Sequence, residues 1–343
     1  MEDERSSRPL AAAKTPRRAS SAAGPGSALD VAVLLGGPSA EREVSFKSGR
    51  AIASALRRLG HRVKEADISP ADTSALDERP IDAVFIALHG EFGESGDVQD
   101  LCEQRGLAYT GSGPAASRLA MDKAAAKQLF RGAGLATPDW AVLEDEQSLA
   151  ERAGLLAGVG VPAVIKPITG GSSVDVVIAR GEAERDLALE DLLDKYGRIL
   201  VERFIAGREL TVGILGGSTL PVLEIIPAGE SYDWHAKYDD DAGTRYQFDH
   251  GLPAEAVAAN EDSARRAFAC LGCRDMGRAD YILDSAGRAW LLEMNTIPGF
   301  TDHSLLPKAA ARAGISFDRL VGRILELAVA RSRMANRQAE DGR

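Results

Sequence analysis

Short apolar runs alternate with amphipathic segments over the first third of the chain. The run Val31-Ala32-Val33-Leu34-Leu35 ends in Gly36-Gly37, and the run 81–88 ends at His89-Gly90. Continuous apolar runs of this length are typical of strands buried on both faces of a parallel sheet. Between them the pattern predicts a helix over 41–59, stopped by Gly60, and a strand that begins at 61–63. This order predicts a doubly wound α/β sheet, in which ligands lie beyond the carboxyl ends of the strands.

The pattern changes after about residue 112, where antiparallel hairpins replace the strand–helix alternation. Strands are predicted at 163–166, 174–180, 199–204, 210–215, 220–226, 277–284 and 288–294, and helices at 122–133, 261–271 and 317–332. Residues 227–253 form a long polar stretch, which is typical of a functional or mobile loop in a compact domain. This part of the chain is expected to have an α+β structure.

Both ends of the chain have a different composition. Residues 1–29 are rich in Ala, Ser, Pro and Arg and predict a disordered tail, and 333–343 predict a polar tail. The tail has no apolar stretch suited to a secretory signal, and the chain has no 18-residue apolar run for a membrane helix. A net charge of −10 argues against nucleic-acid binding. Three cysteines favour a reducing compartment, so a cytoplasmic protein is expected.

Acidic side chains converge on the last predicted hairpin. The turn at 284–287 would place Asp280 nearly opposite Glu293, and alternation puts Arg278 and Asn295 on the same faces as these carboxylates. Two carboxylates and an amide oxygen suit Mg²⁺, while repulsion would disfavour an unpaired acidic pair on neighbouring strands. The alternative is a solvated hairpin face.

Two glycine-rich segments could approach an anion. Lys166 ends a strand and precedes the loop 167–173, whose glycines and serines could cradle a phosphate, although a plain hairpin turn fits equally well. Gly36-Gly37 precede a helix and could bind an anion, or serve ordinary capping with Ser39. There, Glu41 could complement the helix dipole or hold a ligand ammonium group.

Taken in order, several strings resemble the D-alanine–D-alanine ligase family of the ATP-grasp superfamily over about residues 30–330. They are Leu34–Ser45, Ala87–Gly90, Tyr109–Gly113, Met121–Lys123, Lys237-Tyr238, Gly277–Asp280 and Leu292–Thr301. The resemblance implies an ATP-grasp fold with an N-terminal α/β substrate domain at 30–112. A central ATP-grasp subdomain would follow at 113–201, and a C-terminal one with the metal and substrate sites at 202–332.

The resemblance also implies roles for individual residues. ATP would be bound by Lys123, Lys166, Ser173, Glu202, Phe204, Ile205, Glu209 and Lys237, and two Mg²⁺ (or Mn²⁺) ions by Asp280, Glu293 and Asn295. Glu41 and His89 would hold the first D-alanine, and Ser304 and Leu305 the second. Arg278 and the backbone at Gly299 would stabilise an oxyanion. Ser172 and Tyr238 would link with Glu41 and close the loop over the site.

The implied reaction is ATP-dependent ligation of two D-alanines through an acylphosphate, which serves peptidoglycan precursor synthesis, by a homodimer. The alternatives are a changed second substrate (D-lactate, D-serine or an L-amino acid) and a non-catalytic nucleotide-binding homologue. Lys237-Tyr238 favour the dipeptide enzyme. The sequence departs from the family at Ser95, at 170–175, at Phe204 and at 247–250. Asp175 replaces a glycine, and would repel phosphates unless it points outward or meets a cation.

Overall fold

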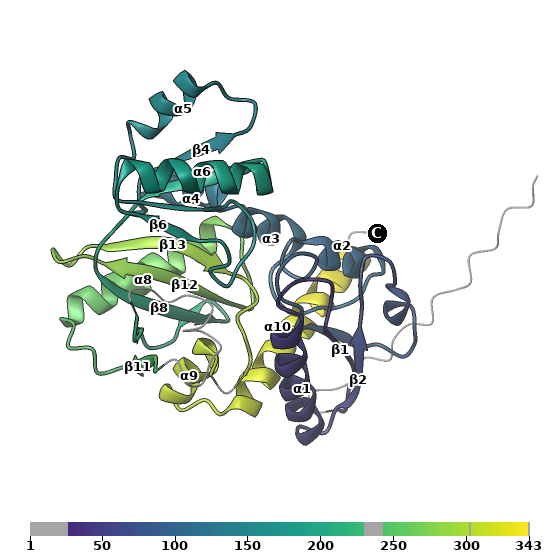
Figure 1. Cartoon of the computed structure of the whole chain (residues 1–343). Coiled ribbons are helices and arrows are strands. Elements are labelled where there is room, and N and C mark those ends of the chain that lie inside the picture. The colour runs from purple at the N-terminus through teal and green to yellow at the C-terminus, as the bar shows by residue number, and fades with distance from the viewer. Residues whose placement is uncertain (1–26, 230–242, 302, 342–343) are drawn as a thin grey trace, which may run out of the picture.

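The computed structural model of the chain describes residues 27–229, 243–301 and 303–341 (Figure 1). These residues form three sheets with helices packed around them. The predicted disordered tail lies almost entirely outside the described residues, as do Lys237 and Tyr238. No described helix combines the length and the apolar character that crossing a membrane requires.

The first sheet is parallel, with strand order β2-β1-β3, as the alternation of apolar runs predicted. Its elements are β1 (Asp30–Leu35), α1 (Arg42–Arg58), β2 (Arg62–Asp67), the 3-10 turn η1 (Ser74–Leu76), β3 (Ala83–Ile86) and α2 (Asp97–Gln104). β1 and β3 are almost entirely buried, which explains their continuous apolar runs. The turn after β1 needs Gly36 at φ 77°, since a Cβ there would lie 2.4 Å from Asp67 Oδ1.

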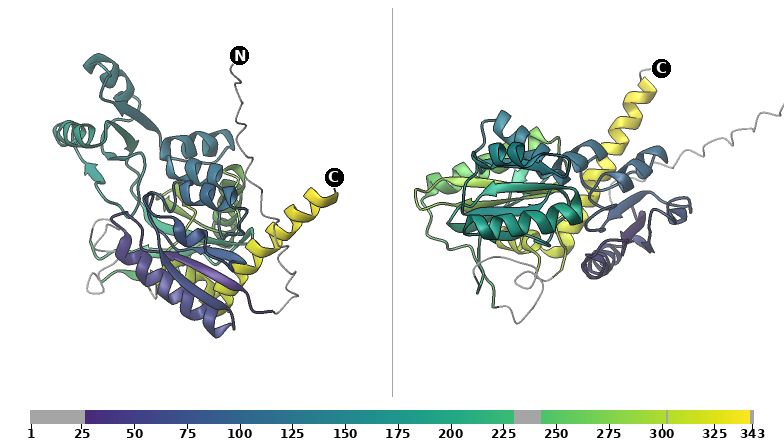
Figure 2. Two further views of the ribbon diagram at one scale, coloured as in Figure 1. Left: turned by 90° about the vertical axis from the view of Figure 1, so that its right-hand side faces the viewer. Right: turned by 45° about the horizontal axis from the view of Figure 1, so that its top comes forward.

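The C-terminal helix α10 (Phe317–Asp341) returns to this first sheet. It passes beside α1 and projects at its far end (Figure 2). Its buried apolar residues, including Leu320 and Ile324, share one hydrophobic core with β1, β3 and α1. The helix continues nine residues beyond the predicted 332, so the residues expected to form a polar tail extend it instead.

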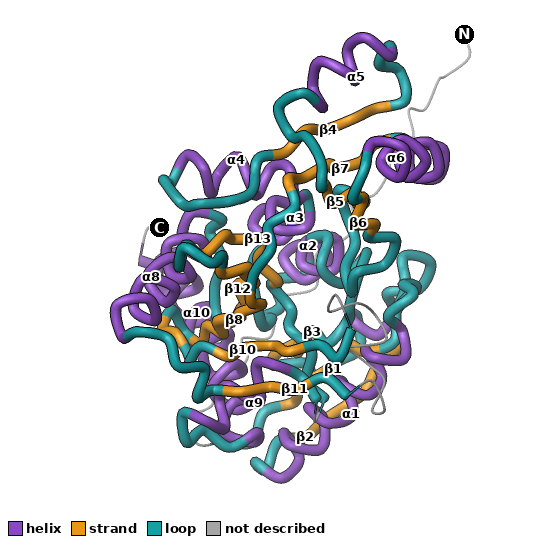
Figure 3. Tube along the Cα trace, turned by 60° about the vertical axis from the view of Figure 1, so that its left-hand side comes forward, coloured by secondary structure: helices purple, strands orange, loops and turns teal. Residues whose placement is uncertain are grey.

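The second sheet is antiparallel, with strand order β4-β7-β5-β6. Its segment of the chain contains α3 (Pro114–Met121), α4 (Lys123–Gly132), β4 (Trp140–Glu144), α5 (Leu149–Leu156), β5 (Ala163–Pro167), β6 (Val177–Ala179), α6 (Glu182–Tyr196) and β7 (Arg198–Arg203). β5 and β6 form the hairpin predicted around the glycine-rich turn. α6 packs along β5, β6 and β7, and together they enclose a separate small core (Figure 3).

The third sheet has the strand order β11-β10-β8-β12-β13, with β9 paired to β8. Its segment of the chain contains β8 (Arg208–Leu215), β9 (Ser218–Thr219), β10 (Leu223–Ile226), β11 (Arg245–Gln247), α8 (Ala254–Cys270), β12 (Met276–Leu283), β13 (Ala289–Asn295) and α9 (Leu305–Arg312). Two predictions were incomplete here. α8 begins seven residues before 261, and β11 lies inside the stretch 227–253 that was interpreted as loop.

Candidate active site

Two adjoining cavities lie where the three sheets approach one another. The smaller encloses about 100 Å³ and the larger about 450 Å³. Six residues line both: Lys123, Gly170, Gly171, Ser172, Arg278 and Glu293. The two cavities therefore form one connected site, in which a ligand in one compartment can reach a ligand in the other.

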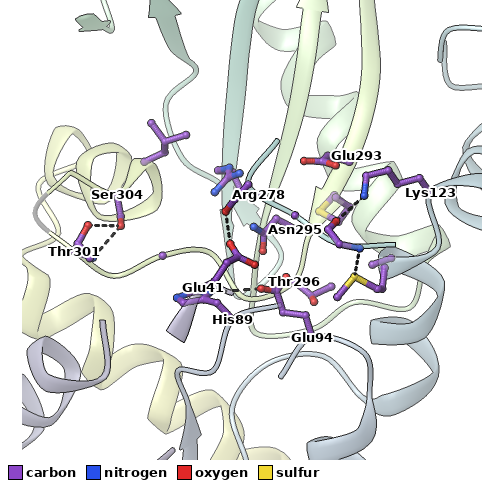
Figure 4. A pocket seen from close by; sticks show the side chains of 18 of the residues that line it. Glu41, His89, Glu94, Lys123, Arg278, Glu293, Asn295, Thr296, Thr301 and Ser304 are labelled. Carbon is purple, nitrogen blue, oxygen red and sulfur yellow. Dashed lines mark hydrogen bonds and ion pairs between the residues drawn. The ribbon is translucent and has the colours of Figure 1, made fainter. Parts of the chain in front are cut away.

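The first sheet contributes an acid and an imidazole to the smaller cavity (Figure 4). Glu41 precedes the first turn of α1, and its carboxylate accepts a hydrogen bond from the Ser172 hydroxyl of the β5–β6 loop. The expected link between Glu41 and Ser172 is therefore present. His89 follows β3 and is 5% exposed, and its Nδ1 lies 3.5 Å from Glu94 Oε1. Two segments far apart in the sequence thus close one side of the cavity.

The opposite side of the smaller cavity is formed by the turn between β13 and α9. Ser304 precedes the first residue of α9, and its hydroxyl accepts a hydrogen bond from the Thr301 amide at 2.9 Å. Gly299 packs against this hydroxyl, because a Cβ there would lie 2.7 Å from Ser304 Oγ. Leu305 lines the same wall. The turn offers backbone groups and the hydroxyls of Thr301 and Ser304, with no carboxylate in its described part.

The β12–β13 hairpin places the predicted acidic pair as expected. Asp280 and Glu293 are direct cross-strand partners, and Arg278 pairs with Asn295. A β-bulge between Asp280 and Tyr281 shifts the register, a feature that the sequence pattern did not predict.

Asp280 has a cationic partner on its own strand. Arg278 Nη2 lies 2.7 Å from Asp280 Oδ2, and Thr211 donates a hydrogen bond of 2.7 Å to Asp280 Oδ1. The positive charge two residues away on the same strand face offsets the repulsion between the carboxylates. Among the described residues, no group of three or more His, Cys, Asp or Glu gathers as a metal site. A cation at the hairpin would therefore depend on two carboxylates and the Asn295 amide.

The larger cavity contains a buried charged cluster. Lys166 Nζ lies 2.9 Å from Glu202 Oε2, and Lys127 Nζ lies 3.1 Å from Glu202 Oε1. Burial alone would raise the pKa of Glu202, but the two ammonium groups lower it to about 2. Lys127 is fully buried, and it also donates a hydrogen bond to Thr137. The cluster fixes Lys166 on the cavity wall, and because its two ammonium groups share one carboxylate it carries a net positive charge.

The rest of the larger cavity is lined by the glycine-rich loop, by the connection between β7 and β8, and by β8 itself. Lys123, at the start of α4, donates a hydrogen bond of 2.6 Å to the Gly170 carbonyl. Burial lowers the pKa of Lys123 below its ordinary value, against the attraction of Glu293. Phe204, Ile205 and Glu209 line the wall, together with apolar residues that include Ile225 and Leu292. This combination of apolar walls and two buried lysines suits an aromatic ligand that carries anionic groups.

The Asp175 carboxylate pairs with a cation. This was one of the two conditions under which it would not repel phosphates, the other being that it points outward. Its carboxylate contacts both Lys195 and the Tyr196 hydroxyl at the end of α6. These contacts lower its pKa. Ser172, Ser173 and Asp175 all have φ between 54° and 57°, a region that few non-glycine residues adopt. The loop is therefore held at one end by Glu41 and at the other by α6.

Every predicted site residue within the described part of the chain lines this site. The smaller cavity has Glu41, His89, Lys123, Ser172, Arg278, Glu293, Asn295, Gly299, Ser304 and Leu305, and the larger adds Lys166, Ser173, Glu202, Phe204, Ile205, Glu209 and Asp280. Lys237 and Tyr238 lie outside the described residues. Sequence reasoning missed Lys127, which touches Glu202, and Ser48, which touches His89. The signal for Ser48 was its place on the apolar face of a predicted helix.

Comparisons with known proteins match this chain to one family of ligases. A family model described as "D-ala D-ala ligase C-terminus" matches residues 129–326. The D-alanine–D-alanine ligase of Gloeobacter violaceus is 44% identical over 299 residues, which cover 87% of this chain and 99% of that protein.

Solved structures agree with the sequence relatives. The D-alanine–D-alanine ligase of Bacillus anthracis complexed with ATP matches with a TM-score of 0.78 and 31% identity, covering 90% of this chain and 100% of that one. The VanG D-Ala:D-Ser ligase of Enterococcus faecalis matches with a TM-score of 0.78 and 25% identity, covering 88% and 100%.

Proposed function

We propose that this chain, which belongs to the D-alanine–D-alanine ligase family and has the ATP-grasp fold, uses ATP to join two D-alanine molecules into D-alanyl-D-alanine. The observation that carries the proposal is the pair of adjoining cavities. The larger offers apolar walls and two lysines to a nucleotide, and the smaller has the size and polar lining for a small amino acid. The product would serve peptidoglycan precursor synthesis.

The proposed reaction has two steps. A carboxylate oxygen of the first D-alanine attacks the γ-phosphorus of ATP, the bond to the β-phosphate oxygen breaks, and ADP leaves. The product is a D-alanyl phosphate. The amine of the second D-alanine then attacks the acyl carbon, loses a proton, and expels inorganic phosphate. Because an acyl phosphate hydrolyses in water, both steps need a site from which water is excluded.

Lysines would bind the phosphates of ATP. Lys123 and Lys166 are both less than 10% exposed and line the larger cavity, and Lys123 also lines the smaller one. Transfer of a phosphoryl group depends mostly on positioning and charge neutralisation, which fixed ammonium groups supply. The arriving phosphates would favour the charged form of Lys123, whose pKa burial lowers. Ser173, Phe204, Ile205 and Glu209 would contact the rest of the nucleotide.

Glu41 would hold the ammonium group of the first D-alanine, with His89 beside it. The carboxylate lies in the smaller cavity, and the Ser172 hydroxyl orients it. The second D-alanine would lie against Ser304 and Leu305. Arg278 lines both cavities, so its guanidinium is placed to stabilise the oxyanion that forms when the amine attacks, together with the backbone at Gly299. Lys237 and Tyr238 keep their family roles as part of this proposal.

Divalent cations fit the donor set of the hairpin. Asp280, Glu293 and Asn295 present hard oxygen ligands on neighbouring positions of β12 and β13, the chemistry that Mg²⁺ and Mn²⁺ prefer. When bound, two such ions would neutralise charge on the phosphates. Thr211 and Arg278 would orient Asp280 for this task.

A cytoplasmic location and a homodimer complete the proposal. ATP and peptidoglycan precursors are cytoplasmic, and the three cysteines are free thiols, which fits a reducing compartment. The homodimer follows from the family resemblance. Sedimentation of the full chain tests it, and a monomer at micromolar concentration would contradict it.

The proposed function is tested by phosphate release from ATP and Mg²⁺ with a panel of substrates. The panel is D-alanine, L-alanine, D-serine, and D-alanine mixed with D-lactate or D-serine, with products identified by mass. We expect release that depends on D-alanine and a D-alanyl-D-alanine product. If a mixed product with D-serine or D-lactate forms in preference to D-alanyl-D-alanine, the second substrate is D-serine or D-lactate and not D-alanine. Bound ATP without release in any mixture would indicate a non-catalytic homologue.

A further inference from the structure

Ser48 is a buried hydroxyl that joins two walls of the smaller cavity without lining the cavity itself. It lies in α1 and is 0% exposed. Its Oγ accepts a hydrogen bond from the Phe300 amide at 3.1 Å and lies 3.3 Å from His89 Nε2. One side chain of the first sheet's helix therefore contacts both the imidazole of one wall and the backbone of the other.

The peptide that Ser48 holds belongs to the turn between β13 and α9. Phe300 lies between Gly299 and Thr301, which both line the smaller cavity. Its ring is 1% exposed and packs edge-on against Phe85 of β3 and Phe317 of α10, with ring centres 6.1 Å and 6.2 Å apart. The ring fixes where the turn lies, and the hydrogen bond to Ser48 fixes how its peptide is rotated.

The hydrogen bonds form a chain with one consistent direction. The Glu94 carboxylate, which also accepts from the Gly90 amide at 2.9 Å, lies beside His89 Nδ1 and favours the proton on that nitrogen. With the proton on Nδ1, Nε2 accepts the Ser48 hydroxyl proton across the 3.3 Å contact. The lone pairs of Ser48 remain to accept from the Phe300 amide. In this series of hydrogen bonds each donor therefore meets an acceptor.

From this geometry we propose that Ser48 is a positioning residue of the ligase reaction. It holds the His89 ring in one tautomer, and through the Phe300 amide it holds the turn that carries Gly299, whose backbone would face the oxyanion. This inference rests on the proposed function. Because Ser48 is fully buried, it acts through His89 and Phe300 and does not touch a substrate.

The chain offers a matched control for testing this role. Ser45 lies one turn earlier on the same face of α1, is also 0% exposed, and donates a hydrogen bond of 2.7 Å to the Ala87 carbonyl. Ser45→Ala and Ser48→Ala each remove one buried hydroxyl of α1, so their losses of stability should be comparable. Ser45 contacts neither His89 nor the 299–301 turn through its hydroxyl.

The experiment compares steady-state kinetics of the wild type, Ser48→Ala and Ser45→Ala, with thermal unfolding of all three. We expect Ser48→Ala to lower kcat about tenfold and raise KM for D-alanine, with KM for ATP within twofold of wild type. Ser45→Ala should keep kcat within twofold despite a similar fall in unfolding temperature. Equal kinetic losses in the two variants, an equal rise in KM for ATP, or unchanged kcat in Ser48→Ala would overturn the inference.

The imidazole gives a second readout that a purely structural role would not change. The chain has five histidines, so the ¹⁵N signals of His89 are assigned by comparison with His89→Gln. We expect the Nδ1–H tautomer in the wild type and in Ser45→Ala, and a mixture of tautomers in Ser48→Ala. A wild type without ligation activity would contradict the proposed function. A fully active wild type with the same tautomer in all variants would contradict the role of Ser48.

Discussion

Replacing Lys127 tests the buried charged cluster most sharply. Lys127→Met removes an ammonium group but keeps a chain of similar length in a fully buried position. Glu202 then faces Lys166 with half of its positive partners removed. A buried carboxylate that loses one cation keeps its desolvation penalty and loses part of its compensation. We therefore expect a large loss of stability from a residue that touches no ligand in our account.

The pKa of Glu202 gives the size of the expected loss of stability. The pKa falls from an ordinary value of 4.5 to about 2, and each pH unit corresponds to about 1.4 kcal/mol. This net shift favours the folded state by about 3 kcal/mol at neutral pH, and the burial that lowers the pKa of Lys127 to about 8 opposes part of it. Removing one of the two lysines should lower the free energy of unfolding by about 2 kcal/mol, which corresponds to roughly 3 °C in unfolding temperature for a chain of this length.

The sign of the pH dependence follows from the direction of this shift. Because the folded-state pKa is depressed, the stabilisation is complete above pH 4.5 and disappears as the pH falls from 4.5 towards 2. Denaturant unfolding of wild type and Lys127→Met at pH 7, 5 and 3.5 measures the difference. It should be full at pH 7 and smaller at pH 3.5.

Arg131→Met is the matched control, since Arg131 lies one turn later on α4 and forms an exposed ion pair with Asp139 at 3.0 Å. Exposed pairs contribute about 1 kcal/mol or less. The reasoning is refuted if Lys127→Met costs no more than Arg131→Met, or if its cost is the same at pH 7 and pH 3.5.

Three further predictions concern catalysis. Arg278→Ala should lower kcat about 100-fold or more, while calorimetry shows ATP affinity within about threefold of wild type; an equal loss of ATP affinity would contradict the oxyanion role. Asp175→Asn should raise KM for ATP several-fold by loosening the glycine-rich loop. The double variant with Lys195→Met should have nearly the same KM, because the two residues form one ion pair; additive increases in KM would show that they act independently. Deleting residues 1–28 should leave kcat within twofold in the same assay, because that segment holds no candidate site residue; a large drop would make the tail part of the working enzyme.

Local patterns predicted those parts of the fold whose pairing is local. The β12–β13 pairing from Leu283 to Tyr281 follows from its turn, where Gly287 has φ 80° and its amide donates to the Asp284 carbonyl. The bulge after Asp280 then sets that residue directly opposite Glu293. The end of α10 was underestimated because its last turns lack an apolar stripe. Just before these turns, Arg331 bonds the Asp275 carboxylate and the Tyr109 carbonyl, which are distant in the sequence. Such contacts depend on the tertiary arrangement and leave no periodic signal in the sequence.

In the candidate site, too, local features were predictable from the sequence and contacts between distant residues were not. The acidic pair of the hairpin was predictable from alternation, and the family motifs located the remaining lining residues. The burial of Lys127 against Glu202 was not predictable, because it depends on side-chain packing across elements. The ion pair of Asp280 with Arg278 lies within β12, on the face where alternation had placed both residues. Asp175 illustrates the limit well. The sequence placed a carboxylate in a loop expected to bind phosphates. In the structure that carboxylate pairs with Lys195, 20 residues later on α6, and this partner could not be predicted from the local pattern.

The central claim is that the D-alanine carboxylate itself is phosphorylated, and isotope transfer tests it most directly. D-alanine labelled with ¹⁸O in both carboxylate oxygens is incubated with the full chain, unlabelled ATP and Mg²⁺, and the released phosphate is analysed by mass. The account predicts one ¹⁸O atom in each phosphate and one D-alanyl-D-alanine per phosphate. Unlabelled phosphate would show that water attacks ATP, and that result would contradict ligation through an acylphosphate.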